Sequence, residues 1–185
     1  MKRIDTDLPG VCILEPVVHG DTRGYFFESF HAGKFAALGL HLHFMQTNVS
    51  RSAHGVLRGL HYQWPMPQGK LVTVLEGAVW DVAVDIRRGS PTYRRWTAAE
   101  LSADNHRLFW IPEGFAHGFC VLSEHATFSY QCTALYDPAA DAALRWNDEQ
   151  LAIAWPLAAP TLSDKDRSAP RLAEIAPGRL PAYTA

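Results

Sequence analysis

The residues best suited to chemistry lie in one stretch, from Val56 to Val74. This stretch holds a guanidinium, an imidazole and an ammonium group, on Arg58, His61 and Lys70, among apolar residues. A neutral imidazole beside two cations suits removal of a proton next to a carbonyl group, because the cations stabilise the oxyanion that develops. The pattern predicts a strand, a short loop and a second strand, forming a hairpin-like unit. Because neighbouring strand residues face opposite ways, we expect a bend near Gly59 to bring the guanidinium and the imidazole together.

A second histidine, His117, ends the turn-rich segment Pro112–His117, which resembles the second motif of the cupins. Metal-binding cupins carry two histidines one residue apart in their first motif, whereas here Tyr62 and Gln63 follow His61. Two imidazoles without a third nitrogen or oxygen ligand make a poor metal site. The sequence therefore predicts no bound metal, and the proton chemistry suggested above requires no redox cofactor.

Length and composition indicate one globular domain. The chain has 185 residues, of which 48% are hydrophobic, and a formal net charge of −2. This length allows a sizeable core, and the charge argues against a nucleic-acid partner. The sequence has neither a secretion signal nor an apolar run of membrane-spanning length, and its three cysteines are scattered. We therefore expect a cytoplasmic protein with no membrane partner.

Strand patterns dominate the chain. Near the N-terminus we expect strands at Val11–Val18 and Tyr25–Phe30, joined by a turn, and then a short helix at Lys34–Leu38 that ends at Gly39. The strands expected after this helix are Met45–Ser50, Val56–Gln63, Lys70–Glu76, Ala78–Ile86, Tyr93–Leu101, Arg107–Ile111, Gly118–Leu122 and Ala126–Leu135. Many short strands with Gly and Pro turns predict an all-β fold, a cupin-type jelly-roll barrel or sandwich with short peripheral helices.

One expected strand, Ala78–Ile86, carries two carboxylates on the same face, at Asp81 and Asp85. Charged residues usually face solvent, which is the simplest interpretation of this alternation. The same pattern also fits two carboxylates that point into a polar barrel interior. The sequence alone leaves both interpretations open.

The strand pattern ends after Tyr136, and the remaining residues are rich in Pro and Ala. We expect this tail to wrap around the barrel, with Trp146 and Trp155 as its anchors. The predicted organisation is a single domain over 1–185. Its three parts are the N-terminal strands at 1–45, a jelly-roll core at 46–136 and the wrapped extension at 137–185.

A series of ordered motifs resembles the dTDP-4-dehydrorhamnose 3,5-epimerases, a family of cupin-fold enzymes of nucleotide-sugar biosynthesis. The motifs that carry this resemblance are Leu14–Pro16, Gly20–Gly24 with Phe26 and Glu28, Gln46–Asn48, Gly55–Gln63, Gln68–Leu71, Asp81–Arg87, Trp110–Phe119, Trp146–Asp148 and Leu162–Asp166. Together they span about residues 4 to 170. So many motifs in the same order make coincidence an unsatisfactory explanation.

The resemblance implies a role for each matched residue. His61 matches the general base, and Asp166 the carboxylate that orients it. Lys70 matches the group that stabilises the enolate oxygen, Tyr130 the general acid, and Tyr136 the ring that stacks on the nucleotide base. The other implied substrate-binding residues are His19, Arg23, Glu28, Gln46, Asn48, Arg58, His117, Asp141 and Lys165. Considered without the resemblance, the two tyrosines are ordinary cross-strand aromatics, and most of the charged residues are surface groups.

The chain also departs from the family pattern. His19 replaces the usual Phe, a residue that in this family reaches the nucleotide of the neighbouring subunit. Thr47 replaces a usual Asp, and Asp141 replaces a usual Glu, which puts the contact of that carboxylate in doubt. Asp164 lies at a variable position, which is why Asp166 is the preferred partner of the base.

The function implied is epimerisation of a dTDP-4-keto-6-deoxyhexose at C3 and C5, which converts dTDP-4-dehydro-6-deoxyglucose into dTDP-4-dehydrorhamnose. We expect a homodimer, because the resemblance implies one and because the apolar strand Val11–Val18 needs a neighbour to avoid an open sheet edge. Three alternatives remain open: an epimerase acting at C3 only, a 3,4-ketoisomerase, and a sugar-sensing cupin without catalytic activity.

Overall fold

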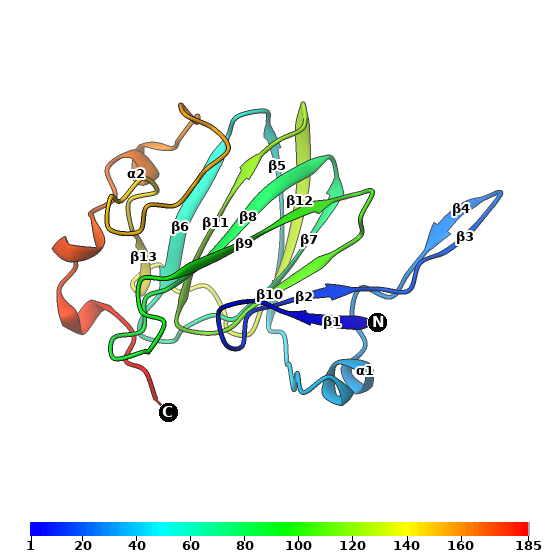
Figure 1. Cartoon of the computed structure of the whole chain (residues 1–185), viewed down its shortest axis with the longest axis horizontal. Coiled ribbons are helices and arrows are strands. Elements are labelled where there is room, and N and C mark those ends of the chain that lie inside the picture. Colours follow the sequence, from blue (N-terminus) through cyan, green and yellow to red (C-terminus); the bar gives the residue numbers. More distant parts are fainter. Residues whose placement is uncertain (185) are drawn as a thin grey trace.

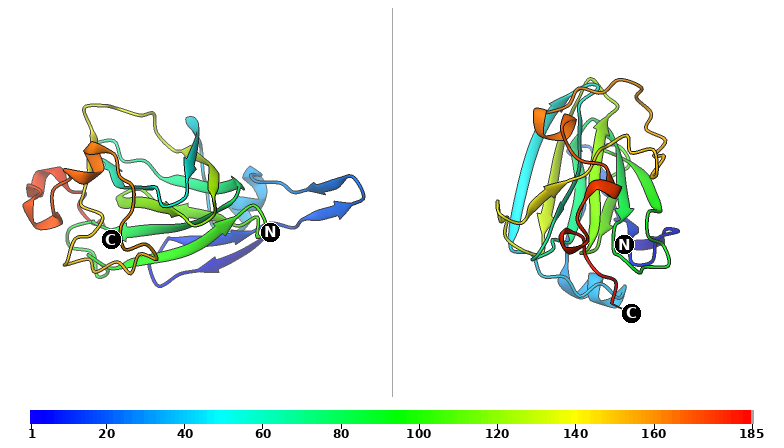
Figure 2. Two further views of the ribbon diagram at one scale, coloured as in Figure 1. Left: turned by 90° about the horizontal axis from the view of Figure 1, so that it is seen from above. Right: turned by 90° about the vertical axis from the view of Figure 1, so that its left-hand side faces the viewer.

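The computed structural model describes residues 1–184 and contains two antiparallel sheets that face each other. In spatial order, the six-stranded sheet comprises β1 (Lys2–Asp5), β2 (Cys12–Glu15), β10 (Leu108–Ile111), β7 (Lys70–Glu76), β12 (His125–Cys132) and β5 (Gln46–Ala53). The five-stranded sheet comprises β13 (Asp141–Ala143), β6 (Leu57–Gln63), β11 (Phe115–Val121), β8 (Ala78–Asp85) and β9 (Trp96–Ser102). Figures 1 and 2 show the two layers, which confirm the predicted all-β jelly roll.

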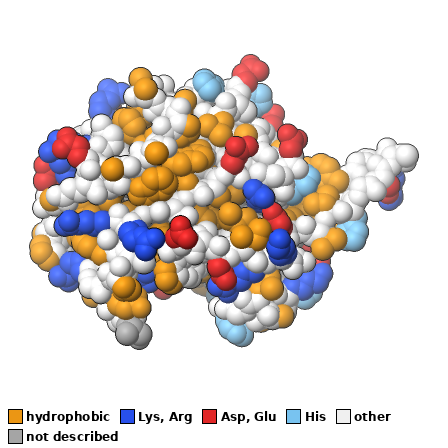
Figure 3. Space-filling model, viewed as in Figure 1, with side chains coloured by type: hydrophobic (Ala, Val, Ile, Leu, Met, Phe, Trp, Pro, Cys, Tyr) orange, Lys and Arg blue, Asp and Glu red, His pale blue; other side chains and the backbone are white. Residues whose placement is uncertain are grey.

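The remaining elements lie outside the two sheets. Strands β3 (His19–Asp21) and β4 (Gly24–Phe26) form a hairpin, called the arm here, which projects from the body (Figures 1 and 3). Two short α-helices, α1 (Ala32–Ala37) and α2 (Asp164–Arg167), and two 3₁₀ helices at Leu172–Glu174 and Pro177–Arg179 complete the described elements. No helix within residues 1–184 is long and apolar enough to cross a membrane.

The N-terminal predictions needed the most correction. The expected strand Val11–Val18 is the shorter β2, and it is paired on both sides, with β1 and with β10. It therefore has no open edge, so our edge argument for a homodimer was wrong. The expected turn before Tyr25 contains β3, and the following strand ends at Phe26. Strands β1 and β13 and helix α2 were not predicted, because segments of three or four residues carry too little periodicity.

The expected hairpin-like unit around His61 and Lys70 was also wrong. Strand β6 pairs with β11 and β13, whereas β7 pairs with β10 and β12 in the other sheet. The loop between them crosses from one sheet to the other, as jelly-roll connections do. The imidazole and the ammonium group consequently come from facing walls of the interior instead of from adjacent strands.

The carboxylates of β8 point into the interior. Asp81 and Asp85 are both fully buried, which decides between the two interpretations that the sequence left open. Asp85 is satisfied by the guanidinium of Arg87 and by the hydroxyls of Ser90 and Thr92. The opposite face of β8 is also covered, because residues of the C-terminal extension pack on it.

Trp155 attaches the C-terminal extension to the five-stranded sheet. The ring of Trp155 packs edge-on against Trp80 of β8, with 5.4 Å between the ring centroids, and against Trp146 at 6.5 Å. The indole N–H of Trp155 also donates a hydrogen bond to the carbonyl of Trp146. Trp155 is therefore an anchor onto the sheet, as the sequence predicted, whereas Trp146 packs against Trp155 within the extension.

Candidate active site

A pocket of about 340 Å³ opens at the end of the interior where β6 ends and β7 begins. Its volume lies within the range of small-molecule sites. The residues that line it are Gln46, Asn48, His61, Tyr62, Gln63, Gln68, Lys70, Tyr130, Tyr136, Asp141 and Lys165. Most of the residues predicted from the sequence are therefore brought together. Tyr62, Gln63 and Gln68 were not predicted, although Gln63 follows His61 at the spacing of a same-face strand neighbour.

A bend in β6 aims His61 and Arg58 to the same side. From Arg58 to His61 this strand advances three residues, while its partner β11 advances two, from Phe119 to His117. Gly59 lies within this bulge with a φ of +134°, a conformation that side chains rarely adopt. A Cβ atom on Gly59 would also come within 2.6 Å of the Cα of Gly118. The bend expected near Gly59 is therefore confirmed.

Arg58 uses the bend to reach across to β5. Its Nε donates a hydrogen bond of 3.0 Å to the Oγ of Ser52, which is buried on the interior side of that strand. The guanidinium is exposed and is not among the groups that line the pocket. Arg58 therefore lies beside the pocket, on the same face as the imidazole.

His61 of the pocket lining forms a short polar pair with Asp166. The Nε2 of His61 lies 2.5 Å from the Oδ1 of Asp166. Asp166 lies on α2, whose N-terminus is capped by the hydroxyl of Ser163. Burial is the largest single influence on the pKa of Asp166 and acts to raise it, but the hydrogen bond and charge of His61, together with hydrogen bonds from Ser163 and Gly59, lower that pKa on balance. When Nε2–H donates to this carboxylate, Nδ1 keeps a lone pair and can act as a base. Asp164 lies fully exposed on the same helix, so the structure brings Asp166, as preferred from the sequence, to the imidazole.

Lys70 and Tyr130 lie on the opposite wall, on β7 and β12. Burial lowers the pKa of the Lys70 ammonium group, and the nearby Cys132, Asp141 and Asp81 act in the opposite direction. Burial raises the pKa of the Tyr130 phenol, which keeps its proton at neutral pH. The pocket thus has an imidazole on one wall and two proton-bearing groups on the other.

The outer part of the pocket has a linked group of three side chains. The hydroxyl of Tyr136 donates to Asp141 Oδ2 at 3.1 Å, and the ammonium group of Lys165 pairs with the same carboxylate. Asp141 is one carbon shorter than the Glu that is usual in the family, and it still contacts both neighbours. Tyr136 itself is 52% exposed.

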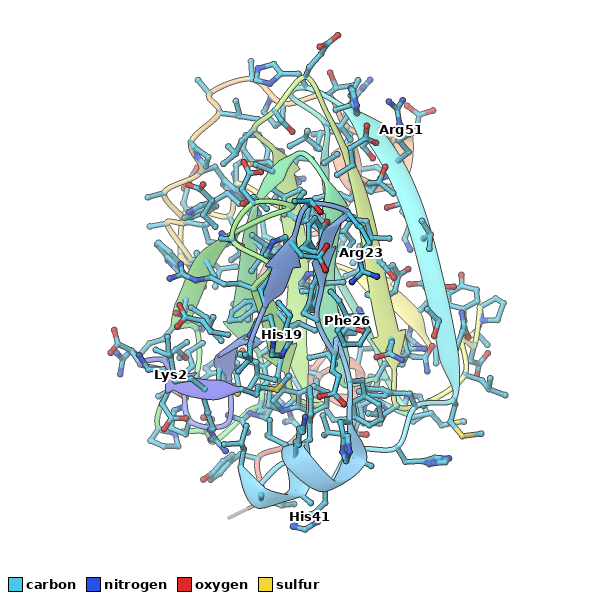
Figure 4. The ribbon with its side chains drawn as sticks, turned by 90° about the vertical axis from the view of Figure 1, so that its right-hand side faces the viewer. Lys2, His19, Arg23, Phe26, His41 and Arg51 are labelled. Atoms are coloured by element: carbon cyan, nitrogen blue, oxygen red, sulfur yellow. The ribbon has the colours of Figure 1, made fainter. Side chains whose placement is uncertain are left out.

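Two groups of expected ligand residues do not line this pocket. His117 is buried behind it, where its Nε2 lies 2.9 Å from Asp81 Oδ1. His19 and Arg23 lie on the exposed arm (Figure 4), and Glu28 follows it. Arg23 forms an ion pair with Asp21, and Glu28 forms one with Lys34, so neither contacts the pocket of its own chain.

Fold and site together define a cupin-type jelly-roll protein with an imidazole–carboxylate pair at the mouth of its barrel. A family model described as dTDP-4-dehydrorhamnose 3,5-epimerase matches residues 5–174. The chain therefore belongs to the dTDP-4-dehydrorhamnose 3,5-epimerase family, as its motifs indicated, and it is an isomerase.

Individual relatives agree with this assignment. The dTDP-4-dehydrorhamnose 3,5-epimerase of Shigella flexneri is 52% identical over 168 residues, which cover 90% of this chain and 93% of that protein. The structure is similar to that of the 3,5-epimerase RmlC of Legionella pneumophila, solved with dTDP-4-keto-L-rhamnose, at a TM-score of 0.97 and 51% identity, covering 100% and 99% of the two chains. A 3'-monoepimerase of Streptomyces bikiniensis, ChmJ, is also similar, with a TM-score of 0.90 and 38% identity. The match covers 96% of this chain and 92% of the ChmJ chain.

Proposed function

We propose that this enzyme epimerises a dTDP-4-keto-6-deoxyhexose at C3 and C5 and so forms dTDP-4-dehydrorhamnose. The observation that carries the proposal is the 2.5 Å pair of His61 and Asp166, which faces Lys70 and Tyr130 across one pocket. A base on one wall and an acid on the other match a reaction that removes a proton from one face of a sugar and returns it to the other. The ligand of the similar Legionella enzyme, dTDP-4-keto-L-rhamnose, supports this substrate class.

In the first half-reaction His61 removes a proton from a carbon beside the C4 carbonyl. The 4-keto group acidifies the hydrogens at both C3 and C5, so one base can serve both carbons if the ring is presented twice. Asp166 holds the imidazole in the reactive tautomer and stabilises the imidazolium that forms. Negative charge moves to the C4 oxygen, where Lys70 stabilises it, while Arg58 adds positive charge from beside the pocket. Removal of one such donor costs about 2.7–4 kcal/mol of transition-state stabilisation in comparable sites.

In the second half-reaction Tyr130 returns a proton to the opposite face of the enolate. Its half-buried phenol carries a proton at neutral pH, because the ordinary pKa of a phenol is about 10 and burial raises that of Tyr130 further. The imidazolium of His61 then releases its proton to solvent and the phenolate of Tyr130 regains one through the open mouth of the pocket, which resets both groups for the second carbon. At the outer end, Tyr136 would stack on the thymine ring, with Gln46, Asn48, Asp141 and Lys165 around the nucleotide.

A solvent-deuterium assay with dTDP-4-keto-6-deoxyglucose tests the proposal. We expect deuterium to appear at both C3 and C5 in the product, read by NMR or mass spectrometry. Incorporation at C3 alone would favour the second candidate, a single epimerase, which the similarity to the Streptomyces 3'-monoepimerase makes specific. A 3,4-keto shift would indicate a ketoisomerase, and binding without exchange would indicate a sugar sensor.

The enzyme is expected to be a homodimer in which each arm completes the other subunit's site. On the arm, His19 and Phe26 pair at its base and Arg23 lies in its turn (Figure 4); all three are exposed, and none lines the pocket of its own chain. Sedimentation at micromolar concentration should show twice the mass of the 20.6 kDa chain. A monomer with full activity would contradict this prediction.

Activity is expected to survive prolonged treatment with EDTA. Gln63 stands where a metal-binding cupin offers its second histidine, and its amide is engaged with backbone groups. Metal analysis of the purified enzyme should accordingly give substoichiometric values. Loss of activity on chelation, followed by recovery with Fe, Mn or Zn, would show that a metal takes part.

A further inference from the structure

The side chain of Gln63 is buried at the edge of the pocket and uses its whole amide. Its Nε2 donates to the carbonyl of Met66 at 2.6 Å and to the carbonyl of Leu135 at 3.1 Å. Its Oε1 accepts from the backbone N–H of Asp137 at 2.9 Å. A primary amide has two N–H donors, and both are used here. Gln63 therefore ties two loops together, one following β6 and one following β12.

The second loop is the segment 134–137, which carries Tyr136. Two further glutamines bind it: Gln68 donates to the carbonyl of Ala134 at 2.9 Å, and Gln46 accepts from the N–H of Tyr136 at 2.8 Å. Each of the four successive residues is thus bonded to a glutamine side chain. The segment has left the ladder of β12, so these amides take the place of a neighbouring strand.

The ring of Tyr136 depends on this support because little else holds it. It is 52% exposed, so packing contributes little to its orientation, and its hydroxyl makes a single bond, to Asp141. A half-exposed ring on an unsupported loop would lose its preferred orientation, and a ligand would then have to restore that order on binding.

We propose that Gln63 is a positioning residue that fixes segment 134–137, and through it the ring of Tyr136, in the orientation that receives the nucleotide base. The inference rests on the proposed function only in taking Tyr136 as the ring that stacks on the base. Gln63 thus has a structural use at the position where a metal-binding cupin carries a ligand.

The test uses dTDP as the probe, because its binding can be measured whether or not the enzyme turns over. Gln63→Leu keeps a side chain of similar size but removes all three hydrogen bonds of the Gln63 side-chain amide. We expect its Kd for dTDP, measured by calorimetry, to rise about tenfold, within the range for loss of one base–aromatic stack. The rate of deuterium exchange at saturating substrate should stay within about twofold, since His61 and Lys70 are untouched. In a Tyr136→Ala background the same change should raise the Kd less than about twofold.

Two further variants separate positioning from folding. Gln150→Leu changes an exposed residue outside the pocket and is the matched control. It should leave both the Kd for dTDP and the rate of deuterium exchange unchanged. Gln68→Leu removes a single bond to the same segment and should raise the Kd in the same direction, even if Gln63→Leu does not fold. The proposal is overturned if both pocket variants keep the parental Kd, or if their effect is as large in the Tyr136→Ala background. A parent enzyme that binds dTDP without exchanging deuterium would instead refute the proposed function alone.

Discussion

The Tyr130→Phe variant is expected to exchange substrate hydrogen with solvent deuterium while forming inverted product about 10²–10⁴ times more slowly than the parent enzyme. His61 can remove a proton and return a deuteron to the same face, which labels the sugar without changing its configuration. Inversion needs an acid on the opposite wall, and the substitution removes only the hydroxyl that supplies it. NMR of the recovered substrate in D₂O measures exchange and inversion in one experiment.

Two further variants help to interpret the result for Tyr130→Phe. His61→Ala should lose exchange and inversion together, because no base remains to form the enolate. Tyr93→Phe, which removes the hydroxyl of a tyrosine that does not line the pocket, is the matched control and should behave as the parent. If Tyr130→Phe inverts at the parental rate, another residue or a water molecule is the acid, and the assignment of Tyr130 is wrong.

The Asp166→Asn variant is expected to lose up to about 10⁴-fold in kcat, the loss produced by the corresponding change in a Ser–His–Asp triad. An asparagine can accept a hydrogen bond from Nε2–H of His61, but it brings no charge to stabilise the imidazolium. If its amide instead donates to Nε2, the proton moves to Nδ1 and the reactive lone pair is lost. Deuterium exchange should therefore fall together with inversion, in contrast to the Tyr130 variant.

Helix α2 provides its own control for this experiment. Asp164→Asn makes the same chemical change two residues earlier, on a side chain that is fully exposed and makes only a 3.9 Å pair with Arg167. Its activity should stay within about twofold of the parent. If Asp166→Asn retains more than about a tenth of the parental kcat, the carboxylate serves the fold instead of the chemistry.

Local periodicity was enough to predict the walls of the pocket. Lys70 begins a strand whose predicted bounds match β7, and Tyr130 lies on an interior-facing position of the predicted strand that became β12. Both residues could be placed because strand alternation is a local property with a period of two. The bend that redirects Arg58 was also predictable, since Gly59 lies between the two polar residues.

Contacts between distant segments could not be predicted in this way. No local pattern pairs His61 with Asp166, which lies 105 residues away, so only the family resemblance indicated it. Which sheet β7 joins depends on the topology of the whole chain. The sequence pattern of strand, loop and strand is the same whether the two strands pair with each other or belong to different sheets. The bonds of Gln63 were missed because its amide satisfies backbone groups of loops whose course the sequence does not specify.

The separation of His61 from Asp166 gives this enzyme an order of maturation. A ribosome releases every strand of the barrel, with the base, the lysine and the tyrosine, before it releases the helix that holds the carboxylate. A nascent chain can therefore bury its interior while its imidazole still lacks a partner. We expect that stage to end when the tail docks through Trp155 on the outer face of β8, which brings α2 and its carboxylate to the imidazole. In a refolding experiment, the rate at which activity returns would report the docking of the tail. The rate at which Phe109 and Phe128 become buried would report the closure of the barrel.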